Sequence, residues 1–82
     1  MNTIRVRLFA GVAGAICRDS TDVVVDRELT AAGLLRQLSE SHPAAGGLLG
    51  RSRVAVNMEY VPADHVIRPG DDVAVVPPVS GG

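Results

Sequence analysis

The sequence predicts a two-layer α+β domain in which one main helix packs against one mixed sheet. Three observations carry this prediction. The chain has 82 residues, enough for a single domain with one core. Segments close to both of its ends show the alternating or continuous apolar pattern of strands. A segment near the middle changes to the apolar spacing of a helix, and a helix between strands needs a sheet to cover its apolar side.

The first two strands are predicted over residues 3–10 and 20–26. In the first, "TIRVRLFA", apolar and polar side chains alternate, so that Ile4, Val6 and Leu8 share one face. The second, "STDVVVD", contains three consecutive valines, which favour strands. Because the two segments follow each other along the chain, we expect them to pair as a hairpin.

The main helix is predicted in the segment "LTAAGLLRQLSESHP", residues 29–43. Thr30 is placed to act as its N-cap. The helix should end at His42, because Pro43 follows and the residue before a proline avoids the helical backbone conformation. The apolar side chains at i, i+3, i+4 and i+7 form one stripe: Ala31, Leu34, Leu35 and Leu38.

The second half of the chain is predicted to supply the remaining strands. Residues 44–50, "AAGGLLG", are interpreted as a flexible linker whose two leucines reach the core. Residues 52–57 alternate as a strand does, and a short edge strand is expected near Tyr60. A turn at 69–71 precedes the last strand, 72–76. This strand is apolar on both sides, so we expect it to be central and covered on both faces.

The order of these elements defines the predicted topology. It is strand, strand, helix, strand, short strand, strand. The first and last strands are the best candidates to lie side by side in the middle of the sheet, which is the arrangement of the β-grasp, or ubiquitin-like, roll. We assign residues 1–76 to this domain and residues 77–82 to an extended C-terminal tail.

The predicted function is concentrated in this tail. Its two prolines remove backbone donors and stop the last strand, and its two final glycines carry no β-carbon. Such a segment can thread a narrow tunnel in another protein and present a terminal carboxylate there. Once the carboxylate is joined to AMP, a sulfur nucleophile can replace AMP and leave a thiocarboxylate. The tail consists of Pro77, Pro78, Val79, Ser80, Gly81 and Gly82.

Composition and charge argue against several other classes of function. A net charge of −1 and only one Phe and one Tyr do not suit a nucleic-acid surface. No apolar run approaches the ~18–20 residues of a membrane span, and the first residues do not resemble a signal peptide, so we expect a cytoplasmic protein. The sequence offers one cysteine, no metal-binding cluster and no acid–base pair. Catalytic groups are therefore expected to belong to a partner.

The stretch "AVN…VIRPGDDVAVVPPVSGG", together with "RLFA" near the start, resembles the small subunits of molybdopterin synthase, a family of ubiquitin-like sulfur carriers. The resemblance implies that an activating enzyme uses ATP to adenylylate Gly82, which is then converted to a thiocarboxylate. It implies that the tail enters the large subunit of the synthase, where sulfur passes to cyclic pyranopterin monophosphate. The implied assembly joins two small and two large subunits, and the small subunit binds no cofactor or metal.

The chain departs from this resemblance at one point. Members of the family often carry aromatic residues immediately before the two prolines, whereas this chain has Val75 and Val76. The difference affects which partner protein can bind, and it affects the chemistry of the tail less. Contacts with partners are predicted at Val76 and at Phe9. Phe9 lies near the base of the tail if the first and last strands pair, and packing in the core is the alternative role for its side chain.

Two other functions use the same fold and tail. The sulfur can serve the synthesis of cysteine or thiamin, or the chain can be a ubiquitin-like modifier joined through Gly82 to other proteins. All eight basic residues are arginine, so a modifier of this sequence would have no lysine on which to build chains.

The remaining polar residues are interpreted as structural. Asp71 and Asp72 should form the turn before the last strand. His65 is assigned to the surface. Arg5 and Arg7 are expected to be solvated on one face of the first strand, with contact to an acidic partner as the alternative.

Overall fold

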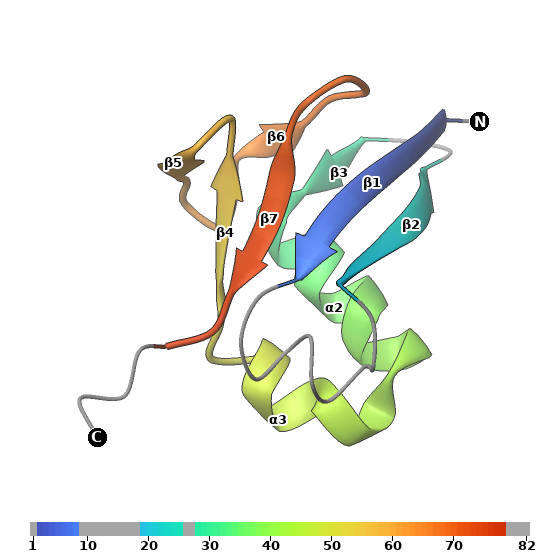
Figure 1. Ribbon diagram of the computed structural model, residues 1–82, viewed down its shortest axis with the longest axis vertical. Coiled ribbons are helices and arrows are strands. Elements are labelled where there is room, and N and C mark those ends of the chain that lie inside the picture. The colour runs from blue at the N-terminus through green and yellow to red at the C-terminus, as the bar shows by residue number, and fades with distance from the viewer. Residues whose placement is uncertain (1, 9–18, 26–27, 79–82) are drawn as a thin grey trace.

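The main sheet places the N-terminal strand and the C-terminal strand side by side. The structure is a computed structural model that describes residues 2–8, 19–25 and 28–78. Five strands form the sheet: β1 (Asn2–Leu8), β2 (Ser20–Val25), β4 (Arg53–Val56), β5 (Glu59–Tyr60) and β7 (Val73–Val76). Their order is β2-β1-β7-β4-β5 (Figure 1). The central strand β7 is parallel to β1 and antiparallel to β4, which confirms the predicted β-grasp topology.

The predicted hairpin at the start of the chain is also confirmed. β1 and β2 are antiparallel, with Ile4 opposite Val23. Both of these side chains are buried, as are Val6 and Leu8 on the same face of β1. The alternation of apolar and polar residues in this segment therefore identified the buried face correctly.

The main helix, α2 (Ala31–Ser41), has the predicted cap. Oγ1 of Thr30 accepts a 3.1 Å hydrogen bond from the backbone N–H of Gly33, which satisfies one of the free donors of the first turn. At the other end, the N–H of His42 donates to the carbonyl oxygen of Leu38 at 2.8 Å, and the helix stops before Pro43. The buried members of the predicted stripe are Ala31, Leu34 and Leu38, and Leu35 is partly buried.

The prediction of a flexible linker over residues 44–50 is wrong. The chain forms a 3-10 turn, η1 (Pro43–Ala45), and then a short helix, α3 (Gly46–Leu49). Ala45 and Leu49 are buried in the core. Glycine disfavours a helix by roughly 1 kcal/mol relative to alanine. Burial of a leucine stabilises by about 1.5–3 kcal/mol, so packing decides the local structure here.

The sequence does not predict the second sheet, in which β3 (Leu29–Thr30) pairs with β6 (Val66–Ile67). Each strand has two residues, too few to show an alternating pattern. In the loop before β6, the carbonyl oxygen of His65 accepts a 2.9 Å hydrogen bond from the N–H of Ala31 at the start of α2. His65 is partly buried, so it lies at the surface as predicted but with part of its area covered.

The helices cover one face of the main sheet (Figure 1). Val73 and Val75 of β7 point toward the helices and are fully buried, whereas Ala74 and Val76 lie on the outer face and are partly exposed. The prediction that β7 is covered on both faces is therefore wrong for the part of the chain that is described. The core consists of Ile4, Val6, Leu8, Val23, Leu29, Ala31, Leu34, Leu38, Ala45, Leu49, Val54, Val56, Ile67, Val73 and Val75.

Candidate functional site

The tail leaves the molecule from the central strand of the sheet. β7 ends at Val76, and the two prolines lead the chain away from the sheet at that end (Figure 1). Pro77 is buried and Pro78 is exposed, so the first proline is packed on the domain and the second faces solvent. Across the ladder, Val76 is paired with Arg53 at the start of β4. The root of the tail is thus bordered by β4.

Most of the other predicted site residues lie outside the described residues. These are Val79, Ser80, Gly81 and Gly82 of the tail and Phe9 after β1. Their roles stay predictions, as does the division of the chain into a domain and a tail. The described part of the site consists of the root of the tail and the sheet face beside it.

The outer face of the sheet is hollowed beside the tail root. A depression of about 310 Å³ extends over β4, β5 and β7, and its lining is mainly apolar. Met58 and Tyr60 contribute large side chains to this lining and are 89% and 54% exposed. Val76, which is predicted to contact a partner, lies in the lining as well. The full lining is Arg7, Ala55, Met58, Tyr60, Asp72, Ala74 and Val76.

The turn that carries Met58 has an unusual backbone. Asn57 and Met58 connect β4 to β5, with φ values of 52° and 70°. Two-residue hairpin turns of this kind favour Asn followed by Gly, because a β-carbon is crowded in the left-handed region. Asn tolerates this region, whereas Met occupies it at a cost of roughly 1–2 kcal/mol. The turn therefore holds an exposed apolar side chain in a strained conformation, and such strain clusters at functional positions.

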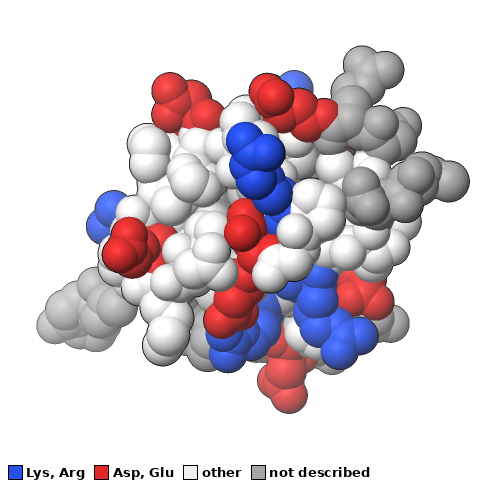
Figure 2. Space-filling view, turned by 90° about the horizontal axis from the view of Figure 1, so that it is seen from above, with Lys and Arg blue, Asp and Glu red and all other residues white. Residues whose placement is uncertain are grey.

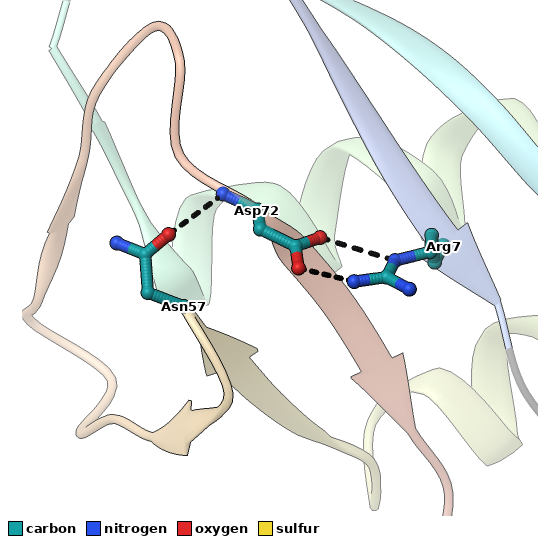
Figure 3. Close-up of polar contacts among 3 residues, drawn as sticks. All are labelled: Arg7, Asn57 and Asp72. Atoms are coloured by element: carbon teal, nitrogen blue, oxygen red, sulfur yellow. Dashed lines mark hydrogen bonds and ion pairs between the residues drawn. The ribbon is translucent and has the colours of Figure 1, made fainter.

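A polar network closes the β1 side of the depression (Figure 3). Nε of Arg7 donates to Oδ1 of Asp72 at 3.0 Å, and a second N–H of the guanidinium contacts the other carboxylate oxygen. Oδ1 of Asn57 accepts from the backbone N–H of Asp72 at 3.0 Å. Arg7 is solvated as predicted, since its side chain remains exposed, but it also forms an ion pair that was not predicted. Its partner Asp72 is distant in sequence, and only the sheet brings the two together.

The turn before β7 has the predicted form. Gly70 adopts a φ of 93°, which favours glycine. Oδ2 of Asp71 accepts from the backbone N–H of Arg68 at 2.9 Å, and its Oδ1 accepts from Nδ2 of Asn57 at 3.3 Å. These hydrogen bonds, with that of Arg68 the largest cause, hold the pKa of Asp71 below its ordinary value. The ionised carboxylate of Asp71 thus stabilises the turn.

Charges of both signs are mixed on the surface. In Figure 2, acidic and basic side chains lie close together on the face that is seen from above. On the outer sheet face, Nε of Arg5 lies 3.1 Å from Oδ1 of Asp22, so Arg5 is paired as Arg7 is. Mixed charge of this kind does not form the basic stripe typical of nucleic-acid binding.

The described residues provide no metal site of three or more His, Cys, Asp or Glu side chains. Among the helices that the structure describes, none is long and apolar enough to cross a membrane. What the described surface offers is an apolar depression beside the tail root, which suits contact with another protein.

Comparison with known proteins assigns the chain to a family. The model described as "ThiS family" matches residues 6–82. The chain belongs to the ThiS family. Among curated relatives of this ThiS-family chain, the molybdopterin synthase sulfur carrier subunit of Dictyostelium discoideum is 39% identical over 99% of this chain and 98% of that protein. The subunit of the same name from Escherichia coli (strain K12) is 36% identical over 96% of this chain and 99% of that protein.

Solved structures agree with the fold. SAMP1 from Haloferax volcanii is similar with a TM-score of 0.80 and 30% identity, over 99% of this chain and 100% of that chain. A complex of subunits 1 and 2 of molybdopterin-converting factor from Helicobacter pylori 26695 contains a chain that matches with a TM-score of 0.66 and 21% identity, over 98% of this chain and 99% of that chain. The ThiS-family chain therefore has the ubiquitin-like β-grasp fold.

Several residues of the outer face were not predicted as site residues. Ala55 and Ala74 are apolar at strand positions that face away from the core, and Met58 and Tyr60 follow on the next turn and strand. The available signal is that the segment over β7 is apolar at every position, a pattern that fits either a second covering layer or a surface for a partner. Sequence periodicity does not separate these two cases.

Proposed function

We propose that this chain is the sulfur carrier subunit of a molybdopterin synthase and that it carries sulfur as a thiocarboxylate on Gly82. The observation that carries the proposal is the match to molybdopterin synthase sulfur carrier subunits along nearly the whole chain. The sequence that ends in Pro-Pro-Val-Ser-Gly-Gly adds chemical support, since a tail without side chains at its end can enter a narrow site.

The proposed chemistry takes place in two steps at the terminal carboxylate. A carboxylate oxygen of Gly82 attacks the α-phosphorus of ATP on the activating enzyme, which forms an acyl adenylate and releases pyrophosphate. A sulfur nucleophile at the oxidation level of hydrosulfide then attacks the carbonyl carbon, and AMP leaves with the former carboxylate oxygen. The product is a thiocarboxylate, whose sulfur is transferred to cyclic pyranopterin monophosphate.

The chain itself contributes the tail that carries sulfur, and it does not contribute the catalytic side chains. If residues 77–82 are extended, they reach at most about 20 Å from the end of β7. We propose that they enter the large subunit, which supplies the groups that act on the pterin. The Helicobacter pylori complex of subunits 1 and 2 supports a partner of this kind. An assembly of two small and two large subunits in the cytoplasm is part of the proposal.

Mass spectrometry of the intact chain tests the proposed chemistry. The chain is co-expressed with the activating enzyme, and the mass should rise by the exchange of one oxygen for sulfur. A variant that lacks Gly82 should show no such product and should not support synthesis of molybdopterin in the presence of the large subunit. Sulfur transfer by the variant at the wild-type rate would exclude the proposal.

Complementation identifies the recipient of sulfur. The chain should restore molybdopterin in a strain that lacks its small synthase subunit. Restoration of cysteine or thiamin synthesis instead, in strains deficient in those carriers, would assign the sulfur to one of those pathways.

The second candidate function is protein modification. It is favoured by the 30% identity to SAMP1 of Haloferax volcanii, where SAMP denotes small archaeal modifier protein. In this case Gly82 would form an amide with a lysine of another protein. Because this chain has no lysine, modified proteins should carry single added units at each site rather than chains linked through side chains. A blot against a tagged form of the chain distinguishes such conjugates from the free carrier.

A further inference from the structure

The outer face of the sheet is divided into a neutralised half and an apolar half. Over β1 and β2, Arg5 is paired with Asp22, and Arg7 is paired with Asp72. Over β7, β4 and β5, the side chains form the apolar depression beside the tail root. A partner that receives the tail comes to lie next to the apolar half, because β7 of that half continues into the tail.

Arg53 differs from the other two arginines of this face. Its guanidinium carbon lies 4.2 Å from the centroid of the Tyr60 ring, so the side chain is positioned by a cation–π contact. Among the described residues, the ion pairs of at most 4.0 Å are those of Arg5 and Arg7, and Arg53 does not take part in one. The guanidinium of Arg53 is thus held in one orientation, and its charge is not neutralised by a described carboxylate.

Arg53 places its positive charge next to the root of the tail. Arg53 is opposite Val76 in the β4–β7 ladder, and Val76 is the last strand residue before the prolines. The terminal carboxylate of Gly82 is up to about 20 Å further along an extended tail. Arg53 is therefore suited to contact the surface around the opening that the tail enters, and not the reacting sulfur.

We propose that Arg53, held on the ring of Tyr60, is a specificity-determining docking residue that binds a carboxylate of the large subunit beside the opening for the tail. The inference rests on the proposed function. The planar guanidinium can stack on tyrosine through its face while its N–H edge donates two parallel hydrogen bonds to a carboxylate. The adjacent depression receives apolar side chains of the same partner, and the stack lowers the entropy that Arg53 loses on binding.

The test is titration of the full-length chain with the large subunit of the same organism at low and high salt. Arg53→Gln should raise Kd by about tenfold at low salt and should flatten the dependence of Kd on salt, because the lost contact is electrostatic. Arg53→Lys should have an intermediate effect, since lysine keeps the charge but not the planar fork. The matched control is Arg36→Gln, which removes an exposed arginine from α2, on the opposite layer of the domain.

The outcomes separate this inference from the proposed function. If Arg53→Gln binds with the wild-type Kd and salt dependence while the wild type carries sulfur, the docking role is overturned and the sulfur carrier function stands. An equal loss of affinity in Arg36→Gln would also overturn it, because the effect would then reflect net charge alone. If the wild type does not bind the large subunit at any salt concentration, both proposals fail. Thermal unfolding monitored by circular dichroism verifies that each variant is folded.

Discussion

Some single residues on the outer face of the sheet have backbone conformations or exposed apolar side chains that do not stabilise the fold. Met58 is the clearest of them, with a φ of 70° and a side chain that is 89% exposed. A glycine would remove the crowding of the β-carbon in this turn. We therefore predict that the methionine side chain contacts a partner next to the depression that borders the tail root.

Met58→Gly should therefore raise the free energy of unfolding by about 1 kcal/mol and weaken binding to the large subunit. Met58→Ala is the matched control, because it removes the same apolar side chain but keeps the β-carbon. Its stability should remain near that of the wild type while its binding is weakened. Urea denaturation measures the stability and calorimetric titration measures the binding. An equal gain in stability for both variants would contradict the account based on backbone strain.

At the scale of elements, α3 shows how packing overrides local preference. Its sequence, Gly46–Leu49, contains two glycines and is not capped by a side chain. The helix persists because Leu49 is fully buried and because Ser52 closes the following turn by donating its hydroxyl hydrogen to the carbonyl oxygen of Leu48 at 2.8 Å. The element thus depends on the core more than on its own sequence.

Leu49→Ala should lower the free energy of unfolding by about 2–5 kcal/mol, because it leaves a cavity in a close-packed core. Leu48→Ala, which changes the neighbouring and only partly buried leucine, should cost clearly less. Both values come from urea denaturation curves. Equal losses for the two variants would show that helix propensity, and not burial, holds α3 in place.

At the scale of the whole molecule, the fold keeps the core apart from the end that we propose carries sulfur. The parallel pairing of β1 with β7 places the central strand next to the N-terminal strand, so that the chain closes its core before the tail begins. The core residues that the structure describes all precede Pro77, which is itself buried against the domain. The domain can therefore hold the root of the tail in place, as the proposed entry of the tail into the large subunit requires.

Deletion of residues 79–82 should leave the free energy of unfolding within about 0.5 kcal/mol of the wild-type value, as expected for residues away from the core. The same deletion should abolish formation of the thiocarboxylate. Chemical denaturation and intact mass measured on the same preparations provide both results, with the chain that lacks only Gly82 as the control. A large loss of stability would place the boundary between domain and tail further along the chain than Val76.

The sequence alone determined those features that depend on neighbouring residues. Three such features follow from a local pattern and are present in the structure. They are the alternating residues of β1, the N-cap of α2 by Thr30 and the end of β7 before Pro77. The chemistry proposed for the tail is local in the same sense, because it needs only an unhindered terminal carboxylate. The resemblance carried by the last residues agrees with the family to which the chain belongs.

Only the tertiary structure decided which surfaces are covered and which distant residues meet. It placed Asp72 next to Arg7 and Arg53 over the ring of Tyr60, and it formed α3 from an apparent linker. It also left the outer face of β7 uncovered by the residues that the structure describes. The physical reason is that contacts between residues far apart in sequence depend on strand order and register, which a local pattern does not encode. An apolar position has the same pattern whether a helix of its own chain or a partner covers it.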